Sequence, residues 1–387
     1  MSINLHGKIP SPIYISGRIG KVLPTFTVTF KDGDTVLQQV QVRQGGTAVY
    51  DGTVPAKDGN AFLGWVLSEP SNPIVDSDNV TAYQQISNVQ SDVTCWAVYQ
   101  DKYSIPDSWD IISQRSQAGT ASNYYNVGDM KRIHIEGTVG TLEVNQDVYV
   151  YILGFDHNSE LEGSGITFGC FKDVSTLKDI AIYDSYYNTS RINGTKAFNM
   201  NHWGNSGSGG WQGCDARYDI LGSTDIAPQE YGTDPWGNRK GYNATSTCAT
   251  NPVANTLMSC LPSDLRAVMK PITKYTDSTS NSNSYASNVE ASVDYLPLLS
   301  EFEIYGVRGY ANQYEADKQL QYAYFAAQNS KVKYKHSNTS VINTYPWWER
   351  SPYYAFNKNM FCIVDSNGNK NSKDADYPVG IAPIFLV

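Results

Sequence analysis

The residues of this sequence that could carry acid–base chemistry are few, and they form no recognisable catalytic set. Asp156 precedes His157, and a histidine beside a carboxylate can act as a general base or as a metal ligand. The sequence pairs them with no serine or cysteine nucleophile motif. Because Gly154 and Phe155 put the pair at the end of a predicted strand, we favour a structural turn whose polar groups bond to the backbone.

Two glutamates at a spacing of two, Glu301 and Glu303, are the second candidate for chemistry. On a strand they would share one face, whereas on a helix they would not. A glycosidase would need a second carboxylate held across a cleft, and sequence alone does not reveal such a pairing. Since their neighbours are apolar, we predict a buried glutamate paired with an arginine, either Arg308 or Arg350.

The sequence Trp347-Trp348-Glu349-Arg350 permits two interpretations. The tryptophans could form a platform on which a sugar stacks. Alternatively, the segment is a core strand whose arginine forms a buried pair with a carboxylate, for which its planar donor fork is suited. We favour the second interpretation and assign five residues to the structural core: Trp347, Trp348, Arg350, Glu301 and Glu303.

Ligand contacts are better sought among aromatic residues in the predicted loops. Loops on a rigid scaffold commonly carry recognition. Tyrosine combines rigid contact area with hydrogen bonding, and asparagine and serine add adaptable polar contacts. The candidate ligand-binding residues are Trp203, Trp236, Tyr242, Tyr353, Tyr354 and Phe356.

No metal or cofactor site is predicted, and no catalytic residue is assigned. The glycines that follow His202 lack the Lys-Ser/Thr ending of a phosphate-binding loop. Asp32 and Asp34 lack the later glutamate of a calcium loop. The cysteines lack the spacing of a zinc site, and we expect most of them to be buried thiols: Cys95, Cys170, Cys214, Cys248, Cys260 and Cys362.

Charge and hydropathy argue against nucleic-acid and membrane partners. The chain has 29 basic and 38 acidic residues and a formal net charge of −9, whereas binding to a nucleic-acid backbone needs clustered Lys and Arg. No apolar stretch approaches the roughly 18 residues of a membrane span. The N-terminus lacks the pattern of a signal peptide. We therefore expect a soluble chain that is made in the cytoplasm and reaches the outside only as part of an assembly.

The chain divides into three parts by composition and pattern. Residues 1–24 carry three prolines, which allow an extended arm or an edge strand. This segment is either an arm that attaches the protein to a larger particle or the first strand of the next domain. Residues 25–101 alternate apolar and polar positions, as an antiparallel β module does. A linker leads to one long domain at 105–387.

The long domain is predicted to hold strands at 132–136, 148–155 and 166–171 and a few helices. A helix is expected from Trp109 to about Arg115, with Asp107 or Ser108 as its cap. Two further helices are predicted at 262–269 and 314–327 from the spacing of their apolar residues.

The β module resembles the β-grasp-like repeat of internalin-type bacterial surface proteins. Its order of strands and turns is similar, and the positions that carry the resemblance are Gly33, Gly45, Pro55, Gly59 and Gly64-Trp65. The resemblance implies a spacer or adhesion module without catalytic residues.

The long domain resembles a domain of unknown function found at the C-termini of phage and prophage structural proteins and of bacterial surface proteins. Eight strings in the right order carry this resemblance, at 152–157, 165–168, 198–201, 209–217, 261–265, 299–306, 321–324 and 347–352. The last of these is followed by Gly380-Ile381-Ala382-Pro383. The closing block is also similar to the C-type-lectin-like fold of formylglycine-generating enzymes and phage variable receptor-binding proteins, although the arginine of their final strand is missing. The cysteine pair or copper site of the enzyme branch is not matched.

These resemblances imply an α+β, β-rich chain: a small antiparallel β-grasp-like module followed by a large C-type-lectin-like domain with two or three short helices. They imply a non-enzymatic protein of the phage virion surface, such as a tail fibre, that binds a host glycan or surface protein. The arm would join other virion proteins, and weak sites would favour a homo-oligomer. A capsid head fibre or decoration protein and a glycan-active enzyme are the alternatives.

Overall fold

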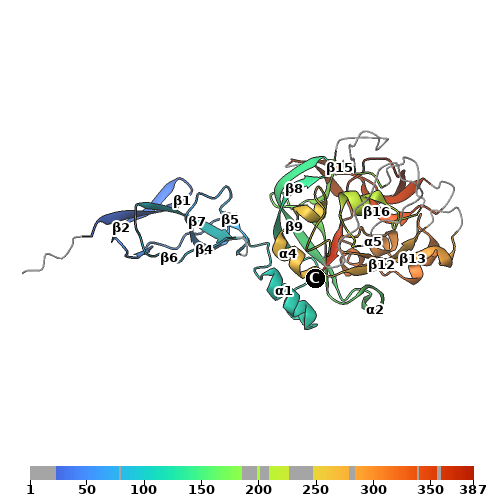
Figure 1. Ribbon diagram of the computed structural model, residues 1–387, viewed down its shortest axis with the longest axis horizontal. Coiled ribbons are helices and arrows are strands. Elements are labelled where there is room, and N and C mark those ends of the chain that lie inside the picture. Colours follow the sequence, from blue (N-terminus) through green and yellow to red (C-terminus); the bar gives the residue numbers. More distant parts are fainter. Residues whose placement is uncertain are drawn as a thin grey trace, which may run out of the picture. The chain divides into compact units, whose positions relative to one another are not determined.

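The computed structural model describes residues 23–77, 80–184, 198–200, 209–225, 247–278, 284–337, 340–354 and 359–387. The chain forms two compact units, Met1–Gln100 and Asp101–Val387. Strand accounts for 39% and helix for 16% of the residues, which confirms the β-rich α+β class. The two units are drawn in Figure 1 and are described separately below.

The first unit is built from short strands whose alternating pattern predicts one buried face. Val28 and Phe30 of β1 have no exposed surface, and the Phe30 and Trp65 rings pack edge to face with centroids 4.7 Å apart. Gly33, at a φ of 55°, makes the turn after β1. The strands are β1 (Thr25–Asp32), β2 (Thr35–Arg43), β3 (Ala48–Val49), β4 (Ala61–Val66), β5 (Ile74–Val75), β6 (Gln85–Ile86) and β7 (Val93–Gln100).

The expectation of a purely antiparallel module was wrong, because the main sheet of this unit is mixed. Its order is β2-β1-β7-β4, and β7 pairs in parallel with both β1 and β5. Parallel neighbours need a long crossover, and the chain between β1 and β7 provides one. The alternation that predicts each strand does not reveal the direction of its partner.

The second unit contains a seven-stranded sheet of order β15-β14-β11-β10-β9-β8, with β19 paired to β10. The strands predicted at 132–136, 148–155 and 166–171 lie in β8, β9 and β10. The strands of this sheet are β8 (Met130–Val139), β9 (Leu142–Phe155), β10 (Ile166–Asp173), β11 (Asp179–Ile182), β14 (Lys333–Ser337), β15 (Ser340–Tyr345) and β19 (Ile384–Leu386).

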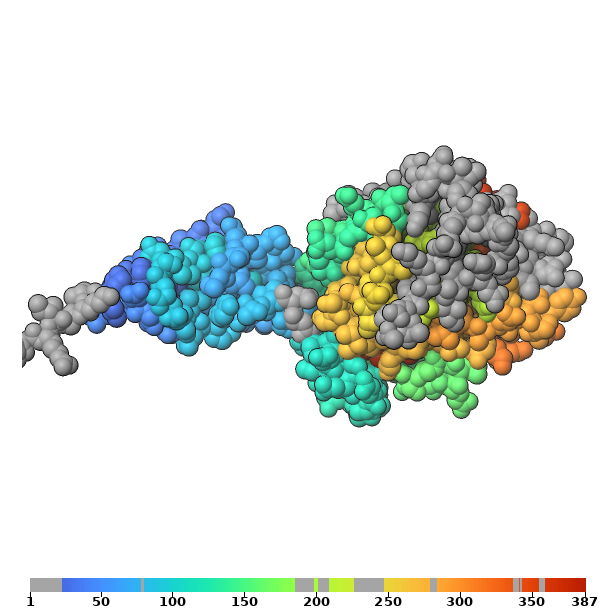
Figure 2. Space-filling view, viewed as in Figure 1, coloured from blue at the N-terminus to red at the C-terminus, as the bar shows by residue number. Residues whose placement is uncertain are grey.

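Two smaller sheets complete the strands of this unit. β12 (Ile272–Asp277) and β13 (Val289–Asp294) form a hairpin. Three residues of β13 are exposed, and the hairpin reaches the surface, where it is orange in Figure 2. β16 (Trp347–Pro352), β17 (Met360–Val364) and β18 (Lys370–Asp374) form a three-stranded meander. Every residue of β16 is buried.

The helices of the second unit are short and more numerous than the two or three expected, because four- to six-residue helices give too short a pattern to detect. In the described residues the α-helices are α1 (Trp109–Gln117), α2 (Ser159–Glu162), α3 (Leu257–Cys260), α4 (Ser263–Val268), α5 (Glu301–Tyr305) and α6 (Ala323–Ala326). Tighter or wider turns lie at Ala121–Asn123, Ala216–Ile220, Ala286–Asn288 and Gln313–Asp317.

The helix predicted at 314–327 is broken, which corrects that prediction. A 3-10 turn at Gln313–Asp317 and α6 flank an extended stretch, in which Leu320 is 55% exposed rather than buried. Within this stretch Tyr322 donates its backbone N–H to Glu303 O at 3.0 Å, and Gln319 donates to Tyr275 O at 2.6 Å. The first of these bonds takes the place of a helical one, and the second, from the Gln319 side chain, joins the stretch to β12.

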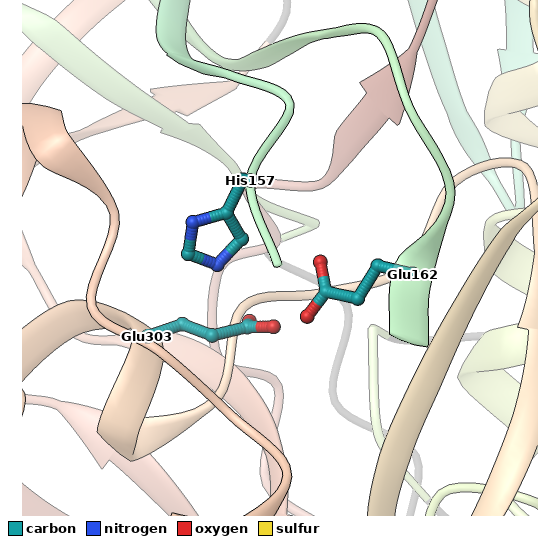
Figure 3. A group of neighbouring side chains, drawn as sticks. All are labelled: His157, Glu162 and Glu303. Carbon is teal, nitrogen blue, oxygen red and sulfur yellow. The ribbon is translucent and has the colours of Figure 1, made fainter. Parts of the chain in front are cut away.

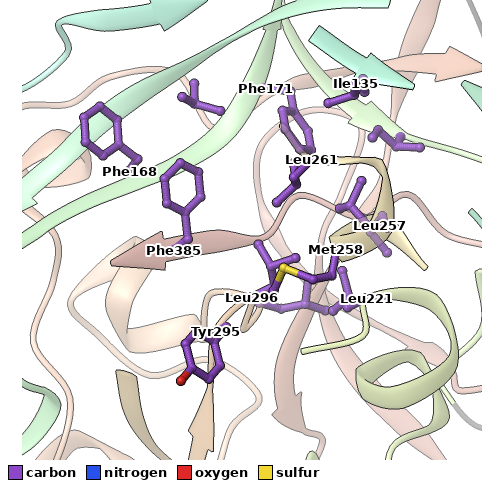
Figure 4. Packing of buried hydrophobic residues seen from close by; sticks show 14 of the residues in the cluster. Ile135, Phe168, Phe171, Leu221, Leu257, Met258, Leu261, Tyr295, Leu296 and Phe385 are labelled. Carbon is purple, nitrogen blue, oxygen red and sulfur yellow. The ribbon is translucent and has the colours of Figure 1, made fainter. Parts of the chain in front are cut away.

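The main core of the second unit lies against the seven-stranded sheet (Figure 4). Phe168 of β10 and Phe385 of β19 stack with ring centroids 5.6 Å apart. Trp109 of α1 packs edge-on against Phe168 at 5.2 Å. The C-terminal strand and the first helix of the unit thus share one core.

The six cysteines are buried and free, which agrees with the expectation of buried thiols. In the part of the chain that is described, no helix has the length and apolarity needed to cross a membrane.

Candidate functional site

Lys274 of β12 is the centre of a buried polar network in the second unit. Its side chain has no exposed surface. The ammonium group donates to Glu162 Oε2 at 2.6 Å, to Glu303 Oε1 at 2.7 Å and to the Tyr322 hydroxyl at 3.0 Å. Because an ammonium group has three N–H donors, these partners satisfy it completely.

Glu303 joins this lysine to β16. α5 begins with a capping box, in which Glu303 Oε2 accepts a hydrogen bond from Ser300 N at 2.9 Å. Arg350 of β16 binds both carboxylate oxygens, Nη1 to Oε2 at 2.5 Å and Nη2 to Oε1 at 2.9 Å. The arginine also donates to Thr276 Oγ1 at 2.9 Å and to Leu298 O at 2.8 Å. The structure therefore pairs Glu303 with Arg350 and not with Arg308.

The Asp156–His157 pair forms a turn after β9, as favoured from the sequence. Asp156 has a φ of 45°, and its Oδ1 accepts a hydrogen bond from Gly165 N at 3.0 Å. Asn158, at a φ of 46°, continues the turn. The carboxylate of Asp156 therefore holds the turn and does not orient His157 as a base.

His157 itself reaches the network from this turn. Its ring stacks on Tyr322 with centroids 3.6 Å apart and planes 19° apart. Figure 3 shows His157 of the turn after β9, Glu162 of α2 and Glu303 of α5 pointing toward one another. One ligand atom from each of the three lies within 4.8 Å of the others.

Burial and charge set the protonation of this group. Burial, with a smaller effect of the Lys274 charge, lowers the pKa of His157 to about 4. Burial alone would raise the pKa of Glu303, but the charges of Arg350 and Lys274 outweigh it and hold that pKa well below its usual value. Burial raises the pKa of Glu162 against the opposing charge of Lys274. At neutral pH, His157 is therefore neutral and Glu303 is ionised.

A neutral histidine and two glutamates are suitable zinc ligands, but the lysine already occupies their centre. The Lys274 ammonium bonds one oxygen of each carboxylate, so a cation is present without a metal. Glu303 accepts four donated hydrogen bonds and has no exposed surface. A carboxylate held in this way is a poor proton acceptor, and the network is better suited to structure than to catalysis.

The occupied centre leads to a testable prediction for metal binding. In Lys274→Ala the ammonium is lost and no side chain takes its place, so His157, Glu162 and Glu303 can bind a divalent cation. We expect Zn²⁺ to raise the melting temperature of this variant, because binding to the folded state stabilises it. The wild-type chain is expected to show no such shift. Calorimetry of both proteins with and without Zn²⁺ measures this, and a shift in the wild type would contradict the assignment of the lysine.

The five residues assigned to the structural core are all buried. Trp347 Nε1 donates to Lys331 O at 3.0 Å, and Trp348 Nε1 donates to Phe198 O at 2.8 Å. Neither tryptophan has an exposed face on which a sugar could stack. Glu301 binds the backbone amides of residues 309–311 at 2.7–3.0 Å. The two glutamates thus have different partners.

Of the predicted ligand-binding residues, Tyr353 and Tyr354 are described and half-buried. Their rings are 6.1 Å apart, and Tyr353 also contacts the Tyr310 ring at 5.5 Å. We call Tyr310, Tyr353 and Tyr354 the tyrosine cluster. The Arg308 guanidinium lies 3.8 Å above the Tyr354 ring. The other candidates lie outside the described residues: Trp203, Trp236, Tyr242 and Phe356.

Sequence reasoning missed Lys274, Glu162 and Tyr310. Lys274 lies in an alternating strand in which a lysine is usually taken to face solvent. Glu162 lies in a four-residue helix that follows a turn. Tyr310 is brought to Tyr353 by a backbone hydrogen bond from Tyr354 N to Tyr310 O at 3.1 Å, and no local pattern reports such a contact.

Comparison with known proteins identifies one family. Residues 191–387 match the model of a family described as a domain of unknown function, DUF6273. No curated protein and no solved structure matches the chain significantly. The matched segment includes Lys274, Glu303, Arg350 and the tyrosine cluster, whereas His157 and Glu162 precede it.

Proposed function

The chain belongs to the DUF6273 family, which is described as a domain of unknown function. For this member of the family we propose a role at the surface of a phage virion, where it binds a host glycan. Binding is non-covalent and uses the tyrosine cluster of the second unit. The virion placement rests on the resemblance of eight ordered strings to phage structural proteins. The glycan rests on the aromatic chemistry of the cluster.

The proposed binding role is supported by one contrast: the ionisable groups of the network are buried, whereas the tyrosines of the cluster are partly exposed. Lys274, Glu303 and Arg350 have no exposed surface and bond to one another. The rings of Tyr310, Tyr353 and Tyr354 lie within 6.1 Å of their neighbours and remain partly exposed. Aromatic rings offer apolar faces for sugar C–H groups, and their hydroxyls offer hydrogen bonds.

A rigid support favours this role. The Glu301 carboxylate binds the amides of Gly309, Tyr310 and Ala311, and Lys370 Nζ donates to Arg308 O at 3.0 Å. At Gly309 a Cβ atom would come within 2.7 Å of Glu301 Oε1, so glycine permits this close approach. A preorganised surface loses less conformational entropy when it binds.

The N-terminal arm and the first unit display this site on the virion. Residues 1–24 act as the arm that attaches to other virion proteins; of these, 1–22 lie outside the described residues. The first unit is a β-grasp-like spacer, and the second is a C-type-lectin-like domain. Assembly into a homo-oligomer would raise the avidity of weak sites.

Binding by the tyrosine cluster is tested by single substitutions in the full chain. Tyr353→Ala and Tyr354→Ala are expected to weaken binding to host polysaccharide at least about tenfold, or ~1.4 kcal/mol. The matched control is Tyr124→Ala, which removes an exposed tyrosine that also stacks on an arginine. Glycan arrays and biolayer interferometry measure the affinities. Equal binding by wild type and both variants would contradict the role of the cluster.

Placement on the virion is tested separately by immunoelectron microscopy of purified particles. Label at the tail tips is expected. Label on the head would favour a head fibre or decoration protein, and absence of label from the particle would contradict the placement. Release of oligosaccharide products during incubation with host polysaccharide would instead favour a glycan-active enzyme.

A further inference from the structure

We propose that the glycan bound at the tyrosine cluster carries an anionic group, a carboxylate or a phosphate, and that Arg308 binds this group. The inference rests on the proposed function and adds to it the chemical class of the ligand. Arg308 is the residue that suggests this ligand, because part of its guanidinium has no hydrogen-bond partner in the described residues.

Arg308 has unused hydrogen-bonding capacity. Its Nε donates to Ala311 O at 2.9 Å, and its Nη1 reaches Gln313 Oε1 only at 3.5 Å. Its Nη2 is shielded from solvent and has no hydrogen-bond partner in the described residues. An unsatisfied donor of this kind costs free energy, which an acceptor supplied by a ligand would recover.

Arg308 also lacks a carboxylate partner among the described residues. By contrast, four of the five other described arginines of the second unit form an ion pair with an aspartate or a glutamate: Arg115, Arg132, Arg217 and Arg350. The fifth, Arg266, donates to backbone carbonyls. Arg115 is the closest comparison, because it too lies over a tyrosine ring, with its guanidinium 3.9 Å from the Tyr124 centroid. The difference is that Asp107 neutralises Arg115.

The geometry around Arg308 suits an acidic sugar. The guanidinium is a planar fork that binds carboxylate or phosphate through two parallel hydrogen bonds. The guanidinium lies 3.8 Å from the centroid of the Tyr354 ring, and the rings of Tyr353 and Tyr310 belong to the same cluster. An anionic group would first displace the long contact from Nη1 to the exposed Gln313, and Nη2 would form the second bond once the side chain turns outward.

The local charge favours an anionic ligand even though the whole chain has a net charge of −9. Lys370 lies beside Arg308, with its Nζ bound to the Arg308 carbonyl oxygen. Glu301 and Glu349 are nearby acids, but neither has exposed surface, and Glu301 accepts the amides of residues 309–311. The exposed charge at the cluster is therefore positive. Since ions screen exposed charges, binding of the anionic group should weaken as salt is added.

The test compares three immobilised glycans with the full-length protein: a neutral glucan, a polyuronate and a glycerol-phosphate polymer that carries sugars. Wild type is expected to bind one or both anionic glycans at least about tenfold more tightly than the neutral glucan. Arg308→Gln should lose this preference and keep its binding to the neutral glucan. Arg308→Lys, which keeps the charge without the fork, should retain only part of the preference. The two anionic polymers separate a carboxylate from a phosphate ligand.

Arg115→Gln is the matched control and should behave as wild type, with thermal melting used to establish that each variant is folded. An Arg308→Gln protein that keeps the preference for anionic glycans would overturn this inference, as would a wild type that binds all three glycans equally. If either of these results is found and Tyr353→Ala still loses glycan binding, only the anionic ligand is ruled out, and the proposed glycan binding at the tyrosine cluster stands. Absence of binding to every glycan would remove both proposals.

Discussion

Replacing Lys274 with methionine is expected to lower the free energy of unfolding by about 3–5 kcal/mol, the usual cost of removing one partner from a buried ion pair. The lysine bonds Glu162 and Glu303, which are 3% and 0% exposed. Methionine fills a similar volume but leaves the two carboxylates facing each other in a medium of low polarity. Glu303 keeps its bonds to Arg350, so most of the cost arises at Glu162.

A double variant separates the charge effect from the loss of packing. In Lys274→Met/Glu162→Gln the unpaired carboxylate is neutralised as well, and we expect this protein to recover part of the lost stability. Contacting residues are expected to show such non-additive effects. Urea denaturation monitored by tryptophan fluorescence measures the free energies.

The matched control is Lys318→Met, because Lys318 is an exposed lysine of the same unit. Surface substitutions of this kind usually change stability by no more than about 0.5 kcal/mol. A Lys274→Met protein as stable as this control would contradict a central role for the buried lysine.

The sequence was most informative where local pattern and composition decide the outcome. Alternating apolar residues predicted β8, β9 and β10, and Ser108 does cap α1 by accepting a hydrogen bond from Ile111 N at 3.3 Å. An arginine beside two tryptophans needs a carboxylate partner if it is buried. The sequence predicted a pair between one of Glu301 and Glu303 and one of Arg308 and Arg350, but which glutamate and which arginine required the tertiary fold.

What could not be predicted depends on contacts between distant segments. Lys274 is 112 residues from Glu162 along the chain and 29 from Glu303. The helix predicted at 314–327 fails because the Tyr322 amide bonds to α5 instead of to its own helix, and the Gln319 side chain bonds to β12. In the first unit, β7 pairs in parallel with β1 after a long crossover, and a period of two does not encode that direction.

We expect the protein to lose stability at alkaline pH because of Glu349, and we expect Glu349→Gln to abolish this loss. This residue of β16 has no exposed surface, and in the described residues neither of its carboxylate oxygens has a hydrogen-bond partner. Burial raises the pKa of Glu349 well above 4.5; nearby Glu301 and Glu315 raise it further, and Lys370 and Arg350 oppose the rise. Burial without a hydrogen-bond partner therefore favours the protonated, neutral form of this side chain in the folded protein.

The sign of the effect follows from proton binding. Above pH 4.5 the unfolded chain has released the Glu349 proton and the folded chain keeps it, so stability falls as pH rises toward the folded pKa, by about 1.4 kcal/mol per pH unit. Burial raises the pKa of Glu315 to about 7, which gives a slope of the same sign up to that pH. The lowered pKa of His157, about 4, gives the opposite slope, but only below its usual 6.5.

The window from pH 7 to 8.5 therefore isolates Glu349 from both of these groups. Across it, unfolding free energies of wild type should fall with pH relative to those of Glu349→Gln, whose amide cannot ionise. At pH 5 the wild-type side chain is also neutral, and its carboxylic acid buries one hydrogen-bond donor where the amide buries two. We therefore expect wild type to be the more stable protein at pH 5 and Glu349→Gln to be the more stable at alkaline pH, so that the two stability curves cross. Glu143→Gln, at an exposed glutamate, is the control and should parallel wild type. Parallel curves for wild type and Glu349→Gln from pH 7 to 8.5 would show that the buried carboxyl group finds a partner when it ionises.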